Sequence, residues 1–205
     1  MGKNTVEDVI DLYGEASSEF FKPHFDSAGI SYPPADLAIL AYKDTKIMEI
    51  WAKDPSSEYS LIYTYPILAA SGSLGPKLRE GDRQVPEGVY HIEAFNPNSA
   101  YHLSMKLNYP NSFDLKHAGI DGRSEPGTNI FIHGRAVSVG CLAIGDKAIE
   151  EVFSLVHEVG RNNTKVIILP NNPSIKKLEV PVGVPKWTVD LYRMIEQEYL
   201  AINPK

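Results

Sequence analysis

The chain has 205 residues, of which 43% are hydrophobic and 22% are charged, and its formal net charge at pH 7 is −6. This composition is that of an ordinary globular domain, with room for a small appendage, and the acidic balance argues against sequence-independent binding of DNA or RNA. The single cysteine, Cys141, excludes an intrachain disulfide and a multi-cysteine metal site.

The N-terminal segment predicts a helix over residues 5–25. Thr5-Val6-Glu7-Asp8 resembles a capping box with Asp in place of Glu, and Pro23 is expected to disturb the last turn. The apolar residues then fall mostly on one face: Val6, Val9, Ile10, Tyr13, Phe20 and Phe21. The segment lacks the apolar core of a secretory signal, so the protein is either cytosolic or has lost a signal. No apolar run is long enough to predict a membrane span.

From residue 37 the apolar pattern changes toward a period of two, which predicts strands. Residues 37–43 and 46–53 are expected to form a hairpin joined at Asp44-Thr45. Three further strands are predicted, at residues 60–68, 88–95 and 101–107. Two long polar connections, 71–87 and 108–128, are rich in turn residues, and loops of that length are often functional.

The last third of the chain mixes strands and helices. Residues 129–133 and 141–145 read as two short strands that are expected to pair in the antiparallel direction. Asp146 is expected to cap a helix that ends near Gly160. A buried strand at 165–170 and a helix from about Thr188 follow. Strands in the middle and helices at the ends predict a β-centred α+β fold.

Residues 132–141, with the sequence IHGRAVSVGC, contain the candidate reactive groups. His133 and Cys141 are eight positions apart, and an antiparallel hairpin would bring them together at one end. The imidazole could then take the proton of the thiol, and the thiolate is the nucleophile. Gly140 leaves room for a substrate and permits backbone angles that aim N–H groups at an oxyanion. The plain structural alternative is a core cysteine beside a histidine in a turn.

The pattern IHG…SVGC resembles the HG…S-x-G-C signature of the L,D-transpeptidase catalytic-domain (YkuD-type) family, and it is most similar to the YafK-like branch, where the spacing is short. Residues 71–90, 96–114 and 140–153 carry the same resemblance, which extends from about Ala38 to Leu169. It implies a mixed, β-sandwich-like catalytic domain. We expect this domain at residues 37–170, a helical segment at 1–36, and a C-terminal helical extension at 171–205 that packs on the domain.

The resemblance implies roles for five residues of this stretch. Cys141 would be the nucleophile and His133 the general base, with the main-chain carbonyl of Gly134 orienting the imidazole. The N–H groups of Gly140 and Cys141 would form the oxyanion hole. Ser138 would shape that turn and contact substrate, with a simple ST-turn as the equal alternative.

Four further side chains are candidates for binding substrate. Arg135 and Lys77 could hold a carboxylate of a stem peptide, for which a guanidinium offers a bidentate grip. The rings of Tyr109 and Tyr101 could wall a peptide groove. The alternatives are solvated charges and tyrosines that only pack. The remaining histidines lack metal-ligand spacing and are expected to be structural or exposed: His24, His91, His102, His117 and His157. No metal or other cofactor is expected.

The function implied by the resemblance is acyl transfer at the diaminopimelate carbonyl of peptidoglycan stem peptides, through a thioester on Cys141. The first alternative is a hydrolase of the same family that releases peptidoglycan-linked lipoprotein or trims stem peptides; the lipoprotein is then a partner as well. The second is a non-catalytic cell-wall-binding module. Such substrates imply the periplasm or cell envelope, with any signal peptide absent from this chain. Neither nucleic acid nor a membrane span is expected.

Overall fold

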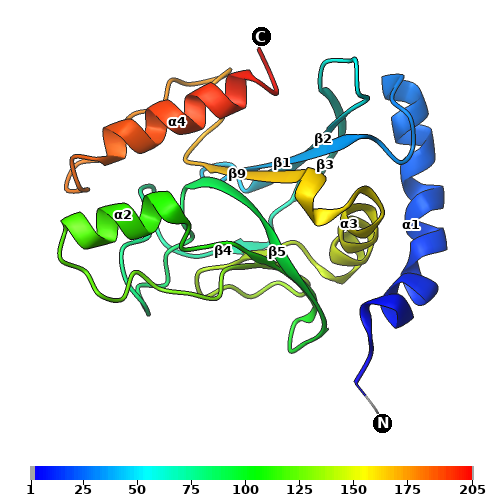
Figure 1. The fold of residues 1–205 in the computed structure, drawn as a ribbon, viewed down its shortest axis with the longest axis horizontal. Coiled ribbons are helices and arrows are strands. Elements are labelled where there is room, and N and C mark those ends of the chain that lie inside the picture. Colours follow the sequence, from blue (N-terminus) through cyan, green and yellow to red (C-terminus); the bar gives the residue numbers. More distant parts are fainter. Residues whose placement is uncertain (1–2, 205) are drawn as a thin grey trace.

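The computed structural model describes residues 3–204 and shows an α+β fold built on one sheet (Figure 1). The helices are α1 (Val6–Ala28), α2 (Ser112–Ile120), α3 (Asp146–Val159) and α4 (Thr188–Leu200), with a short 3₁₀ turn at Arg161–Asn163. The strands are β1 (Asp36–Tyr42), β2 (Ile47–Lys53), β3 (Ser60–Pro66), β4 (Ala69–Ala70), β5 (Gly88–Ser99), β6 (His102–Leu107), β7 (Phe131–His133), β8 (Leu142–Ala143) and β9 (Thr164–Leu169). Across the described residues the strand order is β3-β2-β1-β9-β5-β6-β7-β8-β4. The predicted α+β, β-centred class is confirmed.

The long strand β5 belongs to both halves of the sheet. Its first residues, 88–91, pair with β9, and the rest of the strand pairs with β6. Buried side chains from the two halves, such as Ile39 and Met105, share one hydrophobic core with Phe153 of α3. The halves therefore pack around a common interior, which gives the sandwich-like arrangement.

Helices α3 and α4 cover opposite faces of β1 and β9 (Figure 1). Ile39 packs in the core that contains α3, whereas the next residue, Leu40, packs in a second cluster with Ile195 of α4. Successive residues of a strand point to opposite faces, so a strand covered on both sides needs a continuous apolar run. This explains the sequence LAILAY in β1.

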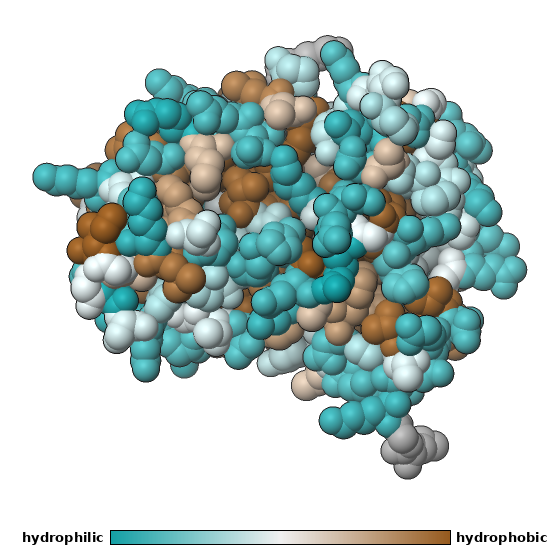
Figure 2. Space-filling view, viewed as in Figure 1, coloured by the Kyte–Doolittle hydropathy of each residue, from teal (hydrophilic) through white to brown (hydrophobic). Residues whose placement is uncertain are grey.

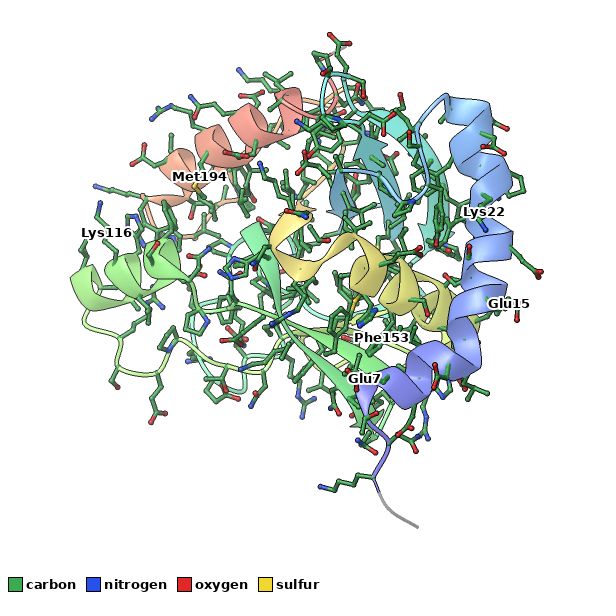
Figure 3. All side chains as sticks on the ribbon, turned by 45° about the vertical axis from the view of Figure 1, so that its right-hand side comes forward. Glu7, Glu15, Lys22, Lys116, Phe153 and Met194 are labelled. Atoms are coloured by element: carbon green, nitrogen blue, oxygen red, sulfur yellow. The ribbon has the colours of Figure 1, made fainter. Side chains whose placement is uncertain are left out.

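Helix α1 packs on the outer side of α3, where Ser17 Oγ donates a hydrogen bond of 2.8 Å to the carbonyl of Glu151. Figure 3 shows Glu7, Glu15 and Lys22 on the outside of α1, while Phe153 lies in the interior. Hydrophilic residues cover most of the face seen in Figure 2, with hydrophobic residues in small groups among them. Within residues 3–204, no helix combines the length and apolar character that crossing a bilayer requires.

The ends of the helices confirm some predictions and correct others. The capping box of Thr5 and Asp8 is present at α1, but Pro23 lies inside the helix, which continues to Ala28. The predicted loop 108–128 contains α2, because the Asn111 side chain accepts hydrogen bonds from the N–H groups of Phe113 and Asp114 and so caps a helix. That polar run was interpreted as a loop because α2 has no clear apolar stripe.

Candidate active site

The strands that carry the candidate residues run parallel, so the predicted antiparallel pairing of 129–133 with 141–145 is wrong. Ile132 of β7 lies opposite Leu142 of β8, and His133 lies opposite Ala143. Between the two strands the backbone is left-handed at Arg135 (φ 56°) and at Gly140 (φ 104°). The chain returns to the N-terminal end of β7 before β8 begins, so the two strands run in the same direction. A two-strand hairpin cannot do this.

The parallel register still places the two candidate groups on one face of the sheet. Extending the pairing by one residue sets Cys141 beside Phe131. Residues two apart on a strand share a face, so Phe131 and His133 point the same way and Cys141 points with them. The structure therefore places His133 and Cys141 on the same face of two neighbouring strands, by a topology other than the expected one.

His133 is buried, with 2% of its surface exposed, and its imidazole is held on two sides. Nδ1 lies 2.6 Å from the carbonyl oxygen of Gly134. A carbonyl only accepts, so Nδ1 carries the proton and Nε2 keeps a free lone pair. The ring of Tyr101 lies over the imidazole, with 4.6 Å between ring centroids. Burial lowers the pKa of His133 below its ordinary value, and the bond to Gly134 offsets only part of this. The imidazole is therefore a neutral base at pH 7.

The position after the histidine admits only glycine without a local shift. A Cβ on Gly134 would stand 2.7 Å from Asp146 Oδ1 and 2.7 Å from the carbonyl oxygen of Tyr101. The same Asp146 oxygen accepts a hydrogen bond of 2.7 Å from the N–H of Arg135. The prediction that Asp146 caps α3 is wrong. Asp146 is the first residue of the helix, and Gly145 occupies the capping position.

Cys141 is a partly buried free thiol just before β8. Its Sγ lies 3.7 Å from the carbonyl oxygen of Asn129. Burial raises the pKa of the thiol above its ordinary value, although a backbone contact with Phe131 and the charge of Lys77 act in the opposite direction. The thiol is therefore protonated at neutral pH, and thiolate forms only when a base takes the proton.

Both N–H groups expected in the oxyanion hole have serine partners. Gly140 N–H donates to Ser71 Oγ at 2.7 Å, and Cys141 N–H donates to Ser138 Oγ at 3.2 Å. Ser138 Oγ in turn donates to the Cys141 carbonyl at 2.6 Å, which closes the turn as an ST-turn does. The oxyanion hole stays a prediction, because both N–H groups bind serine hydroxyls in this structure.

The predicted substrate-binding residues differ in how far they are exposed to solvent. Arg135 is exposed beside the candidate site. Lys77 is buried, with Nζ 2.5 Å from Asp82 Oδ1, and it also donates to the Arg79 carbonyl. Tyr109 is 3% exposed, and its hydroxyl donates to the Pro126 carbonyl at 2.8 Å. The structure favours a surface role for Arg135 and an interior, supporting role for Lys77 and Tyr109.

Two contacts at the site were not foreseen from the sequence. Ser71 reaches Gly140 across 69 positions, and no short motif marks that pair. The ring of Tyr101, a candidate wall of a peptide groove, also lies over the imidazole of His133. Among the described residues, no group of three or more His, Cys, Asp or Glu side chains could hold a metal ion.

Comparisons with known proteins identify close similarity to one family. A family model described as the L,D-transpeptidase catalytic domain (YkuD) matches residues 37–168. The YafK proteins of two Escherichia coli strains, provisionally named L,D-transpeptidases, are 33% identical over 137 residues, which are 64% of this chain and 53% of theirs. The chain thus spans about half the length of these curated relatives.

The fold is also found in a solved structure. The helical cell shape determining protein Pgp2 from Campylobacter jejuni superposes with a TM-score of 0.55 at 21% identity. The match covers 67% of this chain and 48% of that one. At this identity the likeness concerns the fold alone.

Proposed function

The chain belongs to the L,D-transpeptidase catalytic-domain family, and from that membership we propose that it is a cysteine acyl-transfer enzyme of peptidoglycan metabolism. The observation that carries the proposal is the imidazole of His133, whose Nδ1 is bound to the Gly134 carbonyl while Cys141 points from the same face of the sheet. Nε2 is then the atom left to accept a proton. The substrates imply work in the periplasm or cell envelope.

In the proposed first step, Cys141 Sγ attacks the carbonyl carbon of diaminopimelate in a stem peptide, while its proton passes to His133 Nε2. Burial favours the neutral form of both groups in the free protein, so the thiol keeps its proton until His133 accepts it. The tetrahedral intermediate collapses when the carbon–nitrogen bond breaks and the leaving amine takes the proton from the imidazolium. A thioester on Cys141 remains.

The second step releases the acyl group. An amine of a second stem peptide, or water, loses a proton to His133 as it attacks the thioester, and the thiolate that leaves recovers that proton. The amine yields a cross-link, and water yields a shortened stem. Both outcomes use the same acyl-enzyme, so the transferase and the hydrolase are alternatives at one site.

Product masses test the proposal. Purified protein and its Cys141→Ala variant are incubated with tetrapeptide muropeptides and with lipoprotein-linked muropeptides. We expect a cross-linked dimer from the wild type and no product from Cys141→Ala, with the two proteins melting at similar temperatures. A shortened stem or a released lipoprotein would assign hydrolysis instead. Product formation by Cys141→Ala would refute a cysteine mechanism, and equal wall binding without any product would indicate a binding module.

A further inference from the structure

Ser71 stands directly opposite Cys141 at the end of the sheet. Strand β4 pairs with β8 in the antiparallel direction, with Ala69 opposite Ala143 and Ala70 opposite Leu142. Continuing this register by one residue places Ser71 across from Cys141. Ser71 is also the first residue of the long connection 71–87, so it joins that connection to the candidate site.

The hydroxyl of Ser71 links two separate backbone segments. It accepts the N–H of Gly140 at 2.7 Å and donates to the carbonyl of Arg83 at 2.7 Å. It also lies 3.4 Å from Ser138 Oγ, which holds both backbone groups of Cys141. The Ser71 hydroxyl and the Ser138 hydroxyl therefore bind the backbone on both sides of the peptide bond that joins Gly140 to Cys141.

The backbone at Gly140 needs such a constraint. Its φ of 104° lies in the left-handed region, where glycine has many accessible conformations. The Arg83–Gln84 segment packs close to it, since a Cβ on Gly140 would lie 3.4 Å from the Gln84 carbonyl oxygen. Arg83 itself has a φ of 56°, and its carbonyl is the one that Ser71 binds. The Ser71 hydroxyl thus connects two segments with left-handed backbone, one at Gly140 and one at Arg83.

We propose that Ser71 is a positioning residue for acyl transfer: by binding the Gly140 N–H and the Arg83 carbonyl, its hydroxyl sets where Cys141 meets the substrate carbonyl. The inference rests on the proposed function and goes beyond it, because Ser71 lies outside the His–Gly…Ser–x–Gly–Cys pattern. Small displacements of a nucleophile are costly, since about 1 Å can reduce the rate about 100-fold.

The test compares Ser71→Ala with Ser71→Thr and with Ser73→Ala, measured on the full chain with tetrapeptide muropeptides. Ser73 is an exposed serine of the same connection, and none of its side-chain atoms takes part in the hydrogen bonds of the described residues. We expect Ser71→Ala to lower kcat about 10- to 100-fold, with KM within about twofold of wild type and little change in Tm. Ser71→Thr keeps a hydroxyl and should recover most of kcat, and Ser73→Ala should match wild type.

A second measurement does not depend on turnover. Amide hydrogen exchange at Gly140, followed by NMR, should be slow in wild type and in Ser71→Thr and at least tenfold faster in Ser71→Ala. A kcat for Ser71→Ala within threefold of wild type, or equal Gly140 exchange in wild type and Ser71→Ala, would overturn the inference. A fall in kcat that follows a fall in Tm, with no recovery in Ser71→Thr, would reduce Ser71 to a structural role. Failure of the proposed function looks different, because wild type itself would then form no product.

Discussion

The Nδ1 atom of His133 lies 2.6 Å from the carbonyl oxygen of Gly134, so the candidate base and the group that orients it are successive residues. Such a pair needs no acidic side chain to choose the tautomer, because the main-chain oxygen can only accept. It also makes the imidazole sensitive to any shift of the Gly134 peptide.

Replacing His133 should remove the proton acceptor of the proposed mechanism. We expect His133→Ala to lower kcat/KM about 100- to 10,000-fold on tetrapeptide muropeptides, the range that general acid–base groups contribute. Alkylation of Cys141 by iodoacetamide at pH 7 should slow as well. The control is His91→Ala, since His91 is exposed and belongs to the other half of the sheet. Equal alkylation rates in His133→Ala and wild type would show that the two groups are not coupled.

The pH dependence should follow the two perturbed groups. Burial lowers the pKa of His133, so its neutral, basic form persists as the pH falls below the ordinary histidine value near 6.5, and kcat/KM should decline only at lower pH. Burial raises the pKa of Cys141, so in His133→Ala the rate of thiolate alkylation should rise only above the ordinary thiol range. The pH profile of kcat/KM reports the protonation of His133, and the pH profile of alkylation in His133→Ala reports the ionisation of Cys141. A decline of kcat/KM with a midpoint at or above pH 6.5 would contradict the lowered pKa of His133.

Adding a methyl group at Gly134 should disturb both stability and activity. In Gly134→Ala the new Cβ meets the Tyr101 carbonyl and Asp146 at 2.7 Å, so the peptide that binds His133 must shift. We expect a loss of about 1–3 kcal/mol in the free energy of unfolding, as for other overpacked sites, together with a fall in kcat. Gly119→Ala is the matched control, because nothing lies within 4 Å of its Cβ and it sits inside α2. That variant should gain stability by about 0.5–1 kcal/mol. Denaturant titration measures both changes.

Lys77 should contribute to stability through its buried pair with Asp82. Burial by itself would raise the pKa of Asp82, but hydrogen bonds from Lys77 and three backbone N–H groups hold it below its ordinary value. The pair therefore stabilises the fold above the pKa of an unfolded aspartate and loses this effect as the pH falls through the lowered value. At pH 7 we expect Lys77→Met to cost about 3 kcal/mol, since it leaves a largely buried carboxylate without its cation.

The control for Lys77 is an exposed ion pair. Lys176 lies 3.2 Å from Glu179, with most of both side chains in solvent. Lys176→Met should change the free energy of unfolding by less than about 0.5 kcal/mol, because surface pairs contribute little. Similar losses in the two variants would mean that the burial of Lys77 has no energetic consequence.

Several features were predictable from the sequence because a few neighbouring residues decide them. The capping box at Thr5 and Asp8 and the apolar runs of β1 and β9 are patterns within one turn or one strand. The association of His133, Gly134, Gly140 and Cys141 was recognisable for the same reason, since ten consecutive residues contain all four. α2 was missed although Asn111 and Asp114 form a capping box, because the weak apolar pattern of the helix concealed it.

The direction of β8 and the partner of Gly140 were decided only by the tertiary structure. A short strand has the same side-chain pattern whether its neighbour runs parallel or antiparallel, so the segment CLAIG does not specify which. β8 takes its place between β7 and β4, and β4 comes from more than seventy residues earlier in the chain. The Ser71–Gly140 bond depends on that placement. Local interactions are encoded in adjacent residues, whereas these contacts exist only after distant segments have packed around a common core.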